Sequence, residues 1–244
     1  MPPPTPNTGR WHLERVPSTG STNADLVARA RAGEADGLVL VADHQTAGRG
    51  RLGRVWEAPA GSALLASVLI RPKLLVSDLH LVTQWVALAA VDACREAAGV
   101  TPELKWPNDL MVNERKLAGV LAESVVEHGR VAAVVVGIGL NLSWALPEVG
   151  VALNDVAPNP VTTDQLLEAF LRALGDGPDP ERIRRDYRRR LSTLGQRVRV
   201  ELPTEQFEGL ATAVGDDGRL VVTTASGPRT VSAGDVIHLR PMAP

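Results

Sequence analysis

The fold of this chain is decided by two neighbouring segments, Lys105-Trp106-Pro107-Asn108-Asp109 and Arg115-Lys116-Leu117-Ala118-Gly119. Pro107 cannot continue a strand, so the Asn-Asp pair after it is expected at the strand's end, where it could orient a nucleotide or hold Mg²⁺. Lys116 begins an apolar run that predicts a strand, and Gly119 leaves room on that strand for a ligand. A β-hairpin with ordinary turn residues is the simpler alternative, and the spacing alone does not exclude it.

Upstream lies a loop rich in glycine and arginine, with the sequence Gln-Thr-Ala-Gly-Arg-Gly-Arg-Leu-Gly-Arg over Gln45 to Arg54. Its closely spaced glycines let the backbone approach a ligand and change shape. Its arginines are bidentate donors suited to phosphate or carboxylate. The loop fits neither a P-loop, which ends in Gly-Lys-Ser/Thr, nor a dinucleotide fingerprint. A solvated basic turn or an RNA-contacting tract has the same composition, so the loop alone leaves its ligand open.

Downstream, the segment Gly137-Ile138-Gly139-Leu140-Asn141 places glycine at alternate positions of an apolar run. In a strand this clears one face, which weakens the strand unless something packs there. Either a ligand or a packed helix satisfies that requirement. Asn141 is expected at the outgoing end of the strand.

The rest of the chain predicts an α+β fold with an all-β tail. Ser21-Thr22-Asn23 is expected to open an amphipathic helix that ends at Gly33. Further helices are expected over 79–98, 162–174 and 180–194, and strands over 38–42, 62–70, 104–106, 117–126 and 131–142. From residue 195 short β-rich runs alternate with turns, which predicts a small barrel. The expected organisation is a disordered lead over 1–9, a main domain over 10–194 and the barrel over 195–244.

Composition narrows the possible functions. The 26 basic and 28 acidic residues nearly balance, so the net charge of −2 gives no overall attraction to nucleic acid or anionic membranes. Cys94 is the single cysteine, which excludes an intramolecular disulfide and a cysteine-based zinc cluster and indicates a core residue. The proline-rich start does not resemble a signal peptide, and no apolar run reaches the roughly 18 residues that cross a bilayer. A soluble cytoplasmic protein is expected.

Together these segments resemble the catalytic domain of biotin protein ligases, a family that includes the bifunctional biotin repressors. The matching elements follow the family's order over residues 15–145, and Lys-Trp-Pro-Asn-Asp with Lys-Leu-Ala-Gly is the most specific of them. The resemblance implies a biotin/lipoate-ligase-like mixed sheet flanked by helices over 10–194. It also implies an SH3-like C-terminal domain over 195–244.

The resemblance further implies roles for individual residues. Those implied to bind biotin or cover its adenylate are Ser21, Thr22, Asn23, Gln45, Gly48, Arg49, Gly50, Arg51, Lys116, Gly119 and Gly137. Those implied on the nucleotide side are Arg49, Trp56, Lys105, Asn108, Asp109, Asn141 and Arg240, with Asp109 also a metal ligand. Lys116 and Arg51 are implied as catalytic, because Lys116 matches the lysine that bridges the biotin carboxylate and the ATP α-phosphate.

The implied reaction has two steps. Biotin reacts with ATP and Mg²⁺ to give biotinyl-5′-AMP, and the biotinyl group then passes to a lysine of a biotin carboxyl carrier protein. Repressor members carry an N-terminal helix-turn-helix domain, whereas the Ser-Thr-Asn motif here begins at residue 21. A ligase that binds neither DNA nor membrane is therefore expected, and a homodimer is compatible with the sequence.

Three other interpretations remain open. A lipoate-protein ligase would use the same adenylation chemistry. A nucleic-acid-binding protein would use the Gly/Arg loop, the barrel and the arginines of 182–199, although Glu181 and Asp186 intervene and aromatic residues make up only 3% of the chain. We interpret those arginines as a solvated helix face. A catalytically silent biotin sensor would retain the same pocket, and the intact Lys116 argues against it.

Overall fold

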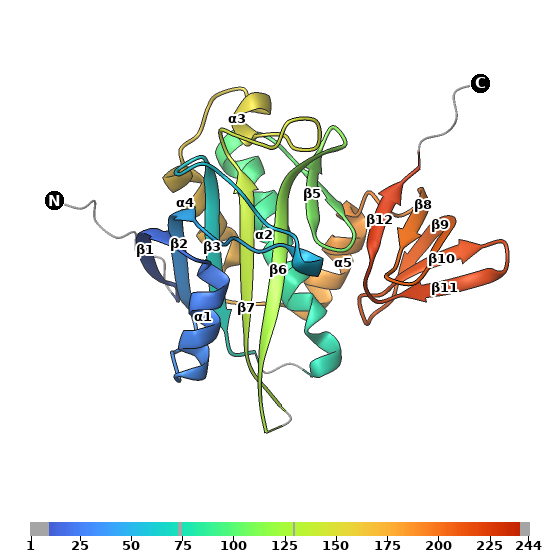
Figure 1. The fold of residues 1–244 in the computed structure, drawn as a ribbon, viewed down its shortest axis with the longest axis horizontal. Coiled ribbons are helices and arrows are strands. Elements are labelled where there is room, and N and C mark those ends of the chain that lie inside the picture. Colours follow the sequence, from blue (N-terminus) through green and yellow to red (C-terminus); the bar gives the residue numbers. More distant parts are fainter. Residues whose placement is uncertain (1–9, 73–74, 129, 240–244) are drawn as a thin grey trace.

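The computed structural model describes residues 10–72, 75–128 and 130–239. A seven-stranded sheet with helices on both faces is followed in this part of the chain by a five-stranded sheet (Figure 1). The predicted lead, residues 1–9, lies outside the described residues. None of the described helices is long and apolar enough to cross a membrane.

The large sheet has the strand order β1-β2-β3-β7-β6-β5-β4. Its strands are β1 (His12–Thr19), β2 (Leu38–Gln45), β3 (Ala63–Ile70), β4 (Glu103–Lys105), β5 (Asp109–Val112), β6 (Arg115–Glu127) and β7 (Arg130–Asn141). β1 and β2 run parallel, and the other neighbours are antiparallel. The sheet is therefore mixed, as expected.

The helices are α1 (Thr22–Arg31), α2 (His80–Ala98), α3 (Leu153–Val156), α4 (Thr163–Leu174) and α5 (Pro180–Arg190). Their ends follow from local chemistry. Ser21 caps α1 by accepting from the amide of Ala24, and Thr162 forms a capping box with Gln165 at the start of α4. Gly99 ends α2 in the left-handed conformation. The helices predicted from the sequence are thus present.

The two faces of the sheet are covered differently, and β7 shows this residue by residue. Val134, Val136, Ile138 and Leu140 belong to the large apolar cluster under α2 and α4. The alternate residues face the other way, where Ala133 and Val135 pack with Leu26 and Ala30 of α1 in a second cluster. Gly137 and Gly139 continue this second row past the N-terminus of α1. A ligand site therefore begins where α1 no longer covers the sheet.

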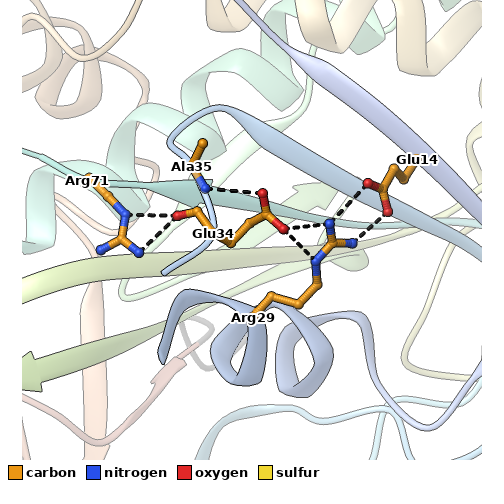
Figure 2. A network of polar contacts seen from close by, with 5 residues as sticks. All are labelled: Glu14, Arg29, Glu34, Ala35 and Arg71. Carbon is orange, nitrogen blue, oxygen red and sulfur yellow. Dashed lines mark hydrogen bonds and ion pairs between the residues drawn. The ribbon is translucent and has the colours of Figure 1, made fainter. Parts of the chain in front are cut away.

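A charged clamp fixes α1 to the sheet (Figure 2). Arg29 donates to Glu14 of β1 at 2.5 and 3.0 Å and to Glu34 at 2.7 and 3.0 Å. Arg71, just after β3, donates to the backbone carbonyls of Glu34 and Ala30. The hydrogen bonds from Arg29 hold the pKa of Glu14 below its ordinary value. Because the C-terminal end of α1 is held in this way, its N-terminal residues have a defined place on the sheet.

The C-terminal sheet is antiparallel and has the order β11-β10-β9-β8-β12. Its strands are β8 (Arg197–Glu201), β9 (Gln206–Val214), β10 (Leu220–Thr224), β11 (Gly227–Val231) and β12 (Asp235–His238). Within the described residues no strand pairing joins the edges β11 and β12 to close a barrel. Its buried residues, such as Val198 and Leu220, belong to the same apolar cluster as the core under α2. A domain boundary at residue 195 stays a prediction.

The structure corrects several predicted boundaries. The helix predicted over 180–194 ends at Arg190, because Leu191 is extended and pairs with Leu104 of β4. β1, β5, β11 and α3 were not predicted; β1 is a largely exposed edge strand, and the others are short. Cys94 is buried in the core as expected, and burial raises the pKa of its thiol to about 12.

Candidate active site

One pocket gathers most of the predicted site residues. It has a volume of about 440 Å³ and lies on the α1 face of the large sheet, bordered by the Gly/Arg loop, β5, β6, β7 and β12. The predicted residues that line it are Ser21, Thr22, Asn23, Gln45, Arg49, Gly50, Arg51, Trp56, Lys105, Asn108, Asp109, Lys116, Gly119 and Gly137. Segments as distant in the chain as Ser21 and Gly137 are thus brought to one site by the sheet.

The floor of the pocket is a glycine strip on β6 and β7. Gly119 and Gly139 are direct partners across the two strands. A Cβ atom built on Gly139 would lie 2.4 Å from Cε2 of Trp56, and one on Gly119 would lie 3.4 Å from Cζ3 of the same ring. A Cβ on Gly137 would lie 2.3 Å from Oδ1 of Asn23. The alternating glycines therefore do clear one face of the strand, and Trp56 and Asn23 pack directly on the exposed backbone.

A polar network forms the end of the pocket next to α1. The backbone N–H and hydroxyl of Thr22 donate to Oε1 of Gln45 at 2.8 and 3.0 Å. The hydroxyl of Ser67 lies 2.7 Å from that of Thr22 and 2.6 Å from Oδ1 of Asn23. Asn23 in turn donates to Glu123 at 2.9 Å. Thr22, Asn23 and Ser67 are buried, Gln45 and Glu123 are partly buried, and the groups orient one another, so they are preorganised to receive a small polar group of a ligand.

The opposite end of the pocket is cationic. Nζ of Lys116 lies 2.6 Å from Oδ1 of Asp109 and 5.7 Å from the centroid of the Trp56 ring. Arg51 donates to Oδ1 of Asn108 at 3.2 Å, and burial lowers the pKa of its guanidinium. Burial also lowers the pKa of Lys105, although the nearby Asp109 carboxylate opposes this. The lysines and arginines that line the pocket outnumber its carboxylates, which are Asp109, Glu201 and Asp235, and this favours the binding of an anionic ligand.

The Gly/Arg loop folds back on itself above the floor. The amide of Trp56 donates to the carbonyl of Gly48 at 3.0 Å, and Arg49 pairs with Val55 in an antiparallel bridge. A Cβ on Gly48 would lie 2.3 Å from the carbonyl oxygen of Trp56, so this position requires glycine. Gly48 therefore shapes the loop and does not line the pocket, and its predicted role in biotin binding stays a prediction.

Two other predicted residues are not placed in the pocket. Asn141 is buried behind it and donates to the carbonyls of Lys116 and Val151 at 3.2 and 3.3 Å. Its amide holds the strand at Lys116, and its role on the nucleotide side stays a prediction. Arg240 lies outside the described residues.

The sequence comparisons agree with this geometry. The model of the biotin/lipoate A/B protein ligase family matches residues 13–141, and that of the biotin protein ligase C-terminal domain matches residues 193–239. The chain belongs to the biotin/lipoate A/B protein ligase family.

Individual members of this ligase family match the chain over nearly its whole length. The biotin–[acetyl-CoA-carboxylase] ligase of Mycobacterium tuberculosis is 41% identical, over 96% of this chain and 91% of its own. The Paracoccus denitrificans ligase of the same name is 34% identical, over 89% of this chain and 97% of its own. The structure of Aquifex aeolicus biotin protein ligase in complex with biotin and ATP superposes with a TM-score of 0.77 at 26% identity, covering 94% of this chain and 99% of that one.

Some pocket residues of this ligase-family chain were not predicted. Gly139 could have been, because it alternates with Gly137. Ser67, the polar residue in the otherwise apolar β3, also had a local signal; it does not line the pocket but contacts Thr22 and Asn23, which do. The exposed side chains of Leu146 and Val149, and Asp235 to Ile237 of β12, line the pocket as well. These last segments reach the pocket only through tertiary packing, and nothing in their local sequence indicates it.

Asp109, the predicted metal ligand, does not belong to a cluster of potential metal ligands among the described residues. Within the described part of the chain no group of three or more His, Cys, Asp or Glu side chains could hold a metal ion. Oδ1 of Asp109 is buried and lies 2.6 Å from Nζ of Lys116. Mg²⁺ in nucleotide sites is commonly held by one or two carboxylates plus phosphate oxygens. Asp109 is therefore suited to supply one ligand to a magnesium ion that arrives with ATP.

Proposed function

We propose that this chain is a biotin protein ligase. It activates biotin with MgATP to give biotinyl-5′-AMP and transfers the biotinyl group to a lysine of a biotin carboxyl carrier protein. The observation that carries the proposal is the pocket itself, in which a glycine-floored slot with a buried polar end leads directly to a cluster of cations. The names of the Mycobacterium and Aquifex relatives, and the ATP and biotin bound in the latter, support the same substrates.

The slot suits biotin because each part of that ligand meets its complement. The ureido group has donors and acceptors, and the Thr22–Gln45 end of the pocket offers both. The apolar ring and chain lie in the slot beside the Trp56 indole, which already packs on the backbone of Gly119 and Gly139. The carboxylate of a ligand placed this way points to Lys116, at the cationic end.

The first step brings a carboxylate to the α-phosphate of a polyanion. At ~4 Å and an effective dielectric constant of ~20, one pair of like unit charges is repelled by about 4 kcal/mol. Lys116 offsets this repulsion when its ammonium lies between the two reacting groups, and Arg51 and Lys105 lie close enough to neutralise further charge. The carboxylate oxygen then bonds to the α-phosphorus while the bond to the leaving pyrophosphate breaks.

The second step requires that the adenylate be kept from water until the acceptor arrives. The Gly/Arg loop already arches over the glycine floor, and Arg51 and Arg54 face the site from it. The neutral amine of the carrier lysine attacks the acyl carbon of the mixed anhydride. An amide bond forms, the acyl–phosphate bond breaks, and AMP and a proton are released.

Mass spectrometry tests the proposal directly. A biotin carboxyl carrier domain incubated with the protein, biotin and MgATP is expected to gain one biotinyl group on one lysine. The Lys116→Ala variant is expected to keep its fold, measured by circular dichroism, and to lose adenylate formation. Near-normal activity of that variant would remove the role given to Lys116.

The same proposal separates biotin from lipoate. ATP–pyrophosphate exchange is expected with biotin and is expected to be absent with lipoate at equal concentration. Exchange with lipoate only would reassign the chain to lipoate ligation within the same family.

A further inference from the structure

The turn that carries Lys105, Asn108 and Asp109 is supported from behind by a segment outside the pocket. Residues 191–193, just after α5, run alongside β4: Leu191 pairs with Leu104, and the amide and hydroxyl of Ser192 donate to the Leu104 carbonyl at 2.8 and 3.0 Å. This segment leads directly into β8 of the C-terminal sheet. The turn and the C-terminal sheet are therefore mechanically connected.

Thr193 is the junction of this connection. Its side chain is fully buried, and its Oγ1 accepts the backbone N–H of Trp106 at 3.0 Å. The same oxygen lies 3.2 Å from Nε2 of His238, on β12. One hydroxyl can accept the amide and donate to the imidazole at once, which satisfies all three groups. Trp106 is thereby attached to β12, next to the three residues at which β12 borders the pocket, Asp235 to Ile237.

The indole of Trp106 makes a second attachment to the C-terminal sheet. Its Nε1–H donates to the carbonyl of Gly218, in the β9–β10 turn, at 3.1 Å. Gly218 has a φ of +77°, and a Cβ there would lie 2.5 Å from the His80 ring, so the position of this carbonyl is closely constrained. Arg188 of α5 holds the same turn by donating to the Val214 carbonyl at 3.2 Å.

We propose that Thr193 and Trp106 are positioning residues through which the C-terminal sheet sets the orientation of the Lys105–Asp109 turn. The inference rests on the proposed function, because it concerns the adenylation site. The Thr193 hydroxyl and the Trp106 indole N–H act on the backbone that carries the ligand-facing groups. A displacement of about 1 Å of such groups can lower a rate by ~10²-fold, so the two hydrogen bonds affect turnover more than binding.

Thr193→Val tests the inference, since it keeps the shape and removes the hydroxyl. The expected result is a ~10–100-fold lower kcat for ATP–pyrophosphate exchange, with the Kd for biotin, measured by calorimetry, changed by less than ~2-fold. Thr193→Ser restores the hydroxyl and is expected to restore most of kcat. Trp106→Phe keeps an aromatic ring, removes the donor and is expected to lower kcat in the same way.

Trp11→Phe is the matched control. Trp11 also donates its indole N–H to a glycine carbonyl, that of Gly175, at 3.0 Å, far from the pocket. This variant is expected to lower the melting temperature while kcat stays at the wild-type value. If Thr193→Val and Trp106→Phe also lower only the melting temperature, the hydrogen bonds are merely structural and the inference is wrong.

Hydrogen exchange provides a readout that does not depend on activity. Amides of residues 105–109 are expected to exchange faster in Thr193→Val than in wild type or Trp11→Phe. If the amides of residues 105–109 exchange hydrogen at the same rate in Thr193→Val as in wild type, the inference is wrong even when the protein is active. If the wild-type chain does not exchange ATP with pyrophosphate, the proposed function is contradicted. The hydrogen-exchange rates of the amides of residues 105–109 would still decide the inference.

Discussion

Two arginine-rich regions of this molecule have similar compositions and different uses. In α5, Arg184, Arg188 and Arg190 are paired with Asp78, Asp216 and Asp92 of other elements. In the Gly/Arg loop, Arg51 forms no ion pair with any described residue and faces the pocket.

The difference lies in the carboxylates that the fold places beside each group of arginines. The arginines of α5 meet carboxylates that the fold brings next to them, so their charge is already balanced. The loop has no acid between Gln45 and Arg54; Arg49 and Arg54 are paired with Glu123 and Asp235 of other elements, and Arg51 faces the cavity. An arginine without a partner beside a cavity indicates a ligand anion, whereas a paired arginine indicates a structural role.

The sharpest way to break this comparison is to remove Arg51. In Arg51→Gly we expect adenylate formation to remain measurable and release of the adenylate to become ~10–100-fold faster, a change of roughly 1.4–2.8 kcal/mol in barrier. Single-turnover release of labelled adenylate measures this. Leu52→Gly is the matched control, because Leu52 has a φ of 56° and glycine is tolerated there. Equal release from both variants would show that loop flexibility, and not the guanidinium, retains the adenylate.

Removal of an α5 arginine should lower the stability of the fold and leave the activity unchanged. Arg190→Ala is expected to lower the free energy of unfolding by about 1–2 kcal/mol, because the partly buried Asp92 loses one of its two cationic partners. Exchange of ATP with pyrophosphate should stay at the wild-type rate. Urea denaturation measures the first quantity, with Arg189→Ala as a control on the same helix. A fall in kcat without a fall in stability would mean that α5 also serves the ligand.

Arg54 shares one feature with Arg51 and another with the arginines of α5. It is a loop arginine that borders the pocket, yet it is paired with Asp235 of β12. Asp235→Asn removes a negative charge from the pocket and frees Arg54 for phosphate, so the KM for MgATP is expected to fall ~2-fold, in line with the small energies of exposed pairs. Glu208→Gln, which removes the partner of Arg199 away from the pocket, should leave KM unchanged. A higher KM in Asp235→Asn would show that Asp235 aids nucleotide binding.

The smallest expected effect is that of low pH on the ion pairs of α5. The hydrogen bond from Arg188 lowers the pKa of Asp216 below 3.8, so this pair stabilises the fold at neutral pH, and the contribution is lost as the pH falls through the lowered pKa. The difference in melting temperature between wild type and Asp216→Asn should be small at pH 7 and should shrink as the pH drops below 3.8. A difference that grows in acid would contradict the sign of the shift.

The sequence predicts those elements and site residues whose signal lies in neighbouring residues of the chain. The strands and helices around Lys105, Lys116 and Gly137 followed from proline, glycine and apolar periodicity, and the site residues followed from the family motifs. Gly48 and Asn141 lie outside the pocket lining, and their roles stay predictions, because a motif does not show whether a residue touches the ligand or supports one that does. Thr193 had no local signal at all, since its partners Trp106 and His238 are distant in the chain. The arginines of α5 were predicted as a solvated face because their carboxylates come from other elements.

The glycine floor has a thermodynamic consequence. Side chains that line a binding site lose rotamer freedom when a ligand orders them, which opposes binding by about 0.5–1.5 kcal/mol for each rotamer-rich side chain. The paired residues Gly119 and Gly139 are backbone that the β6–β7 ladder already holds, so they have no rotamers to lose, and Trp56 packs directly on them. The conformational entropy of binding is therefore concentrated in the arginine-bearing loop. Affinity and residence time are then set mainly on one side of the ligand, by the loop that covers it.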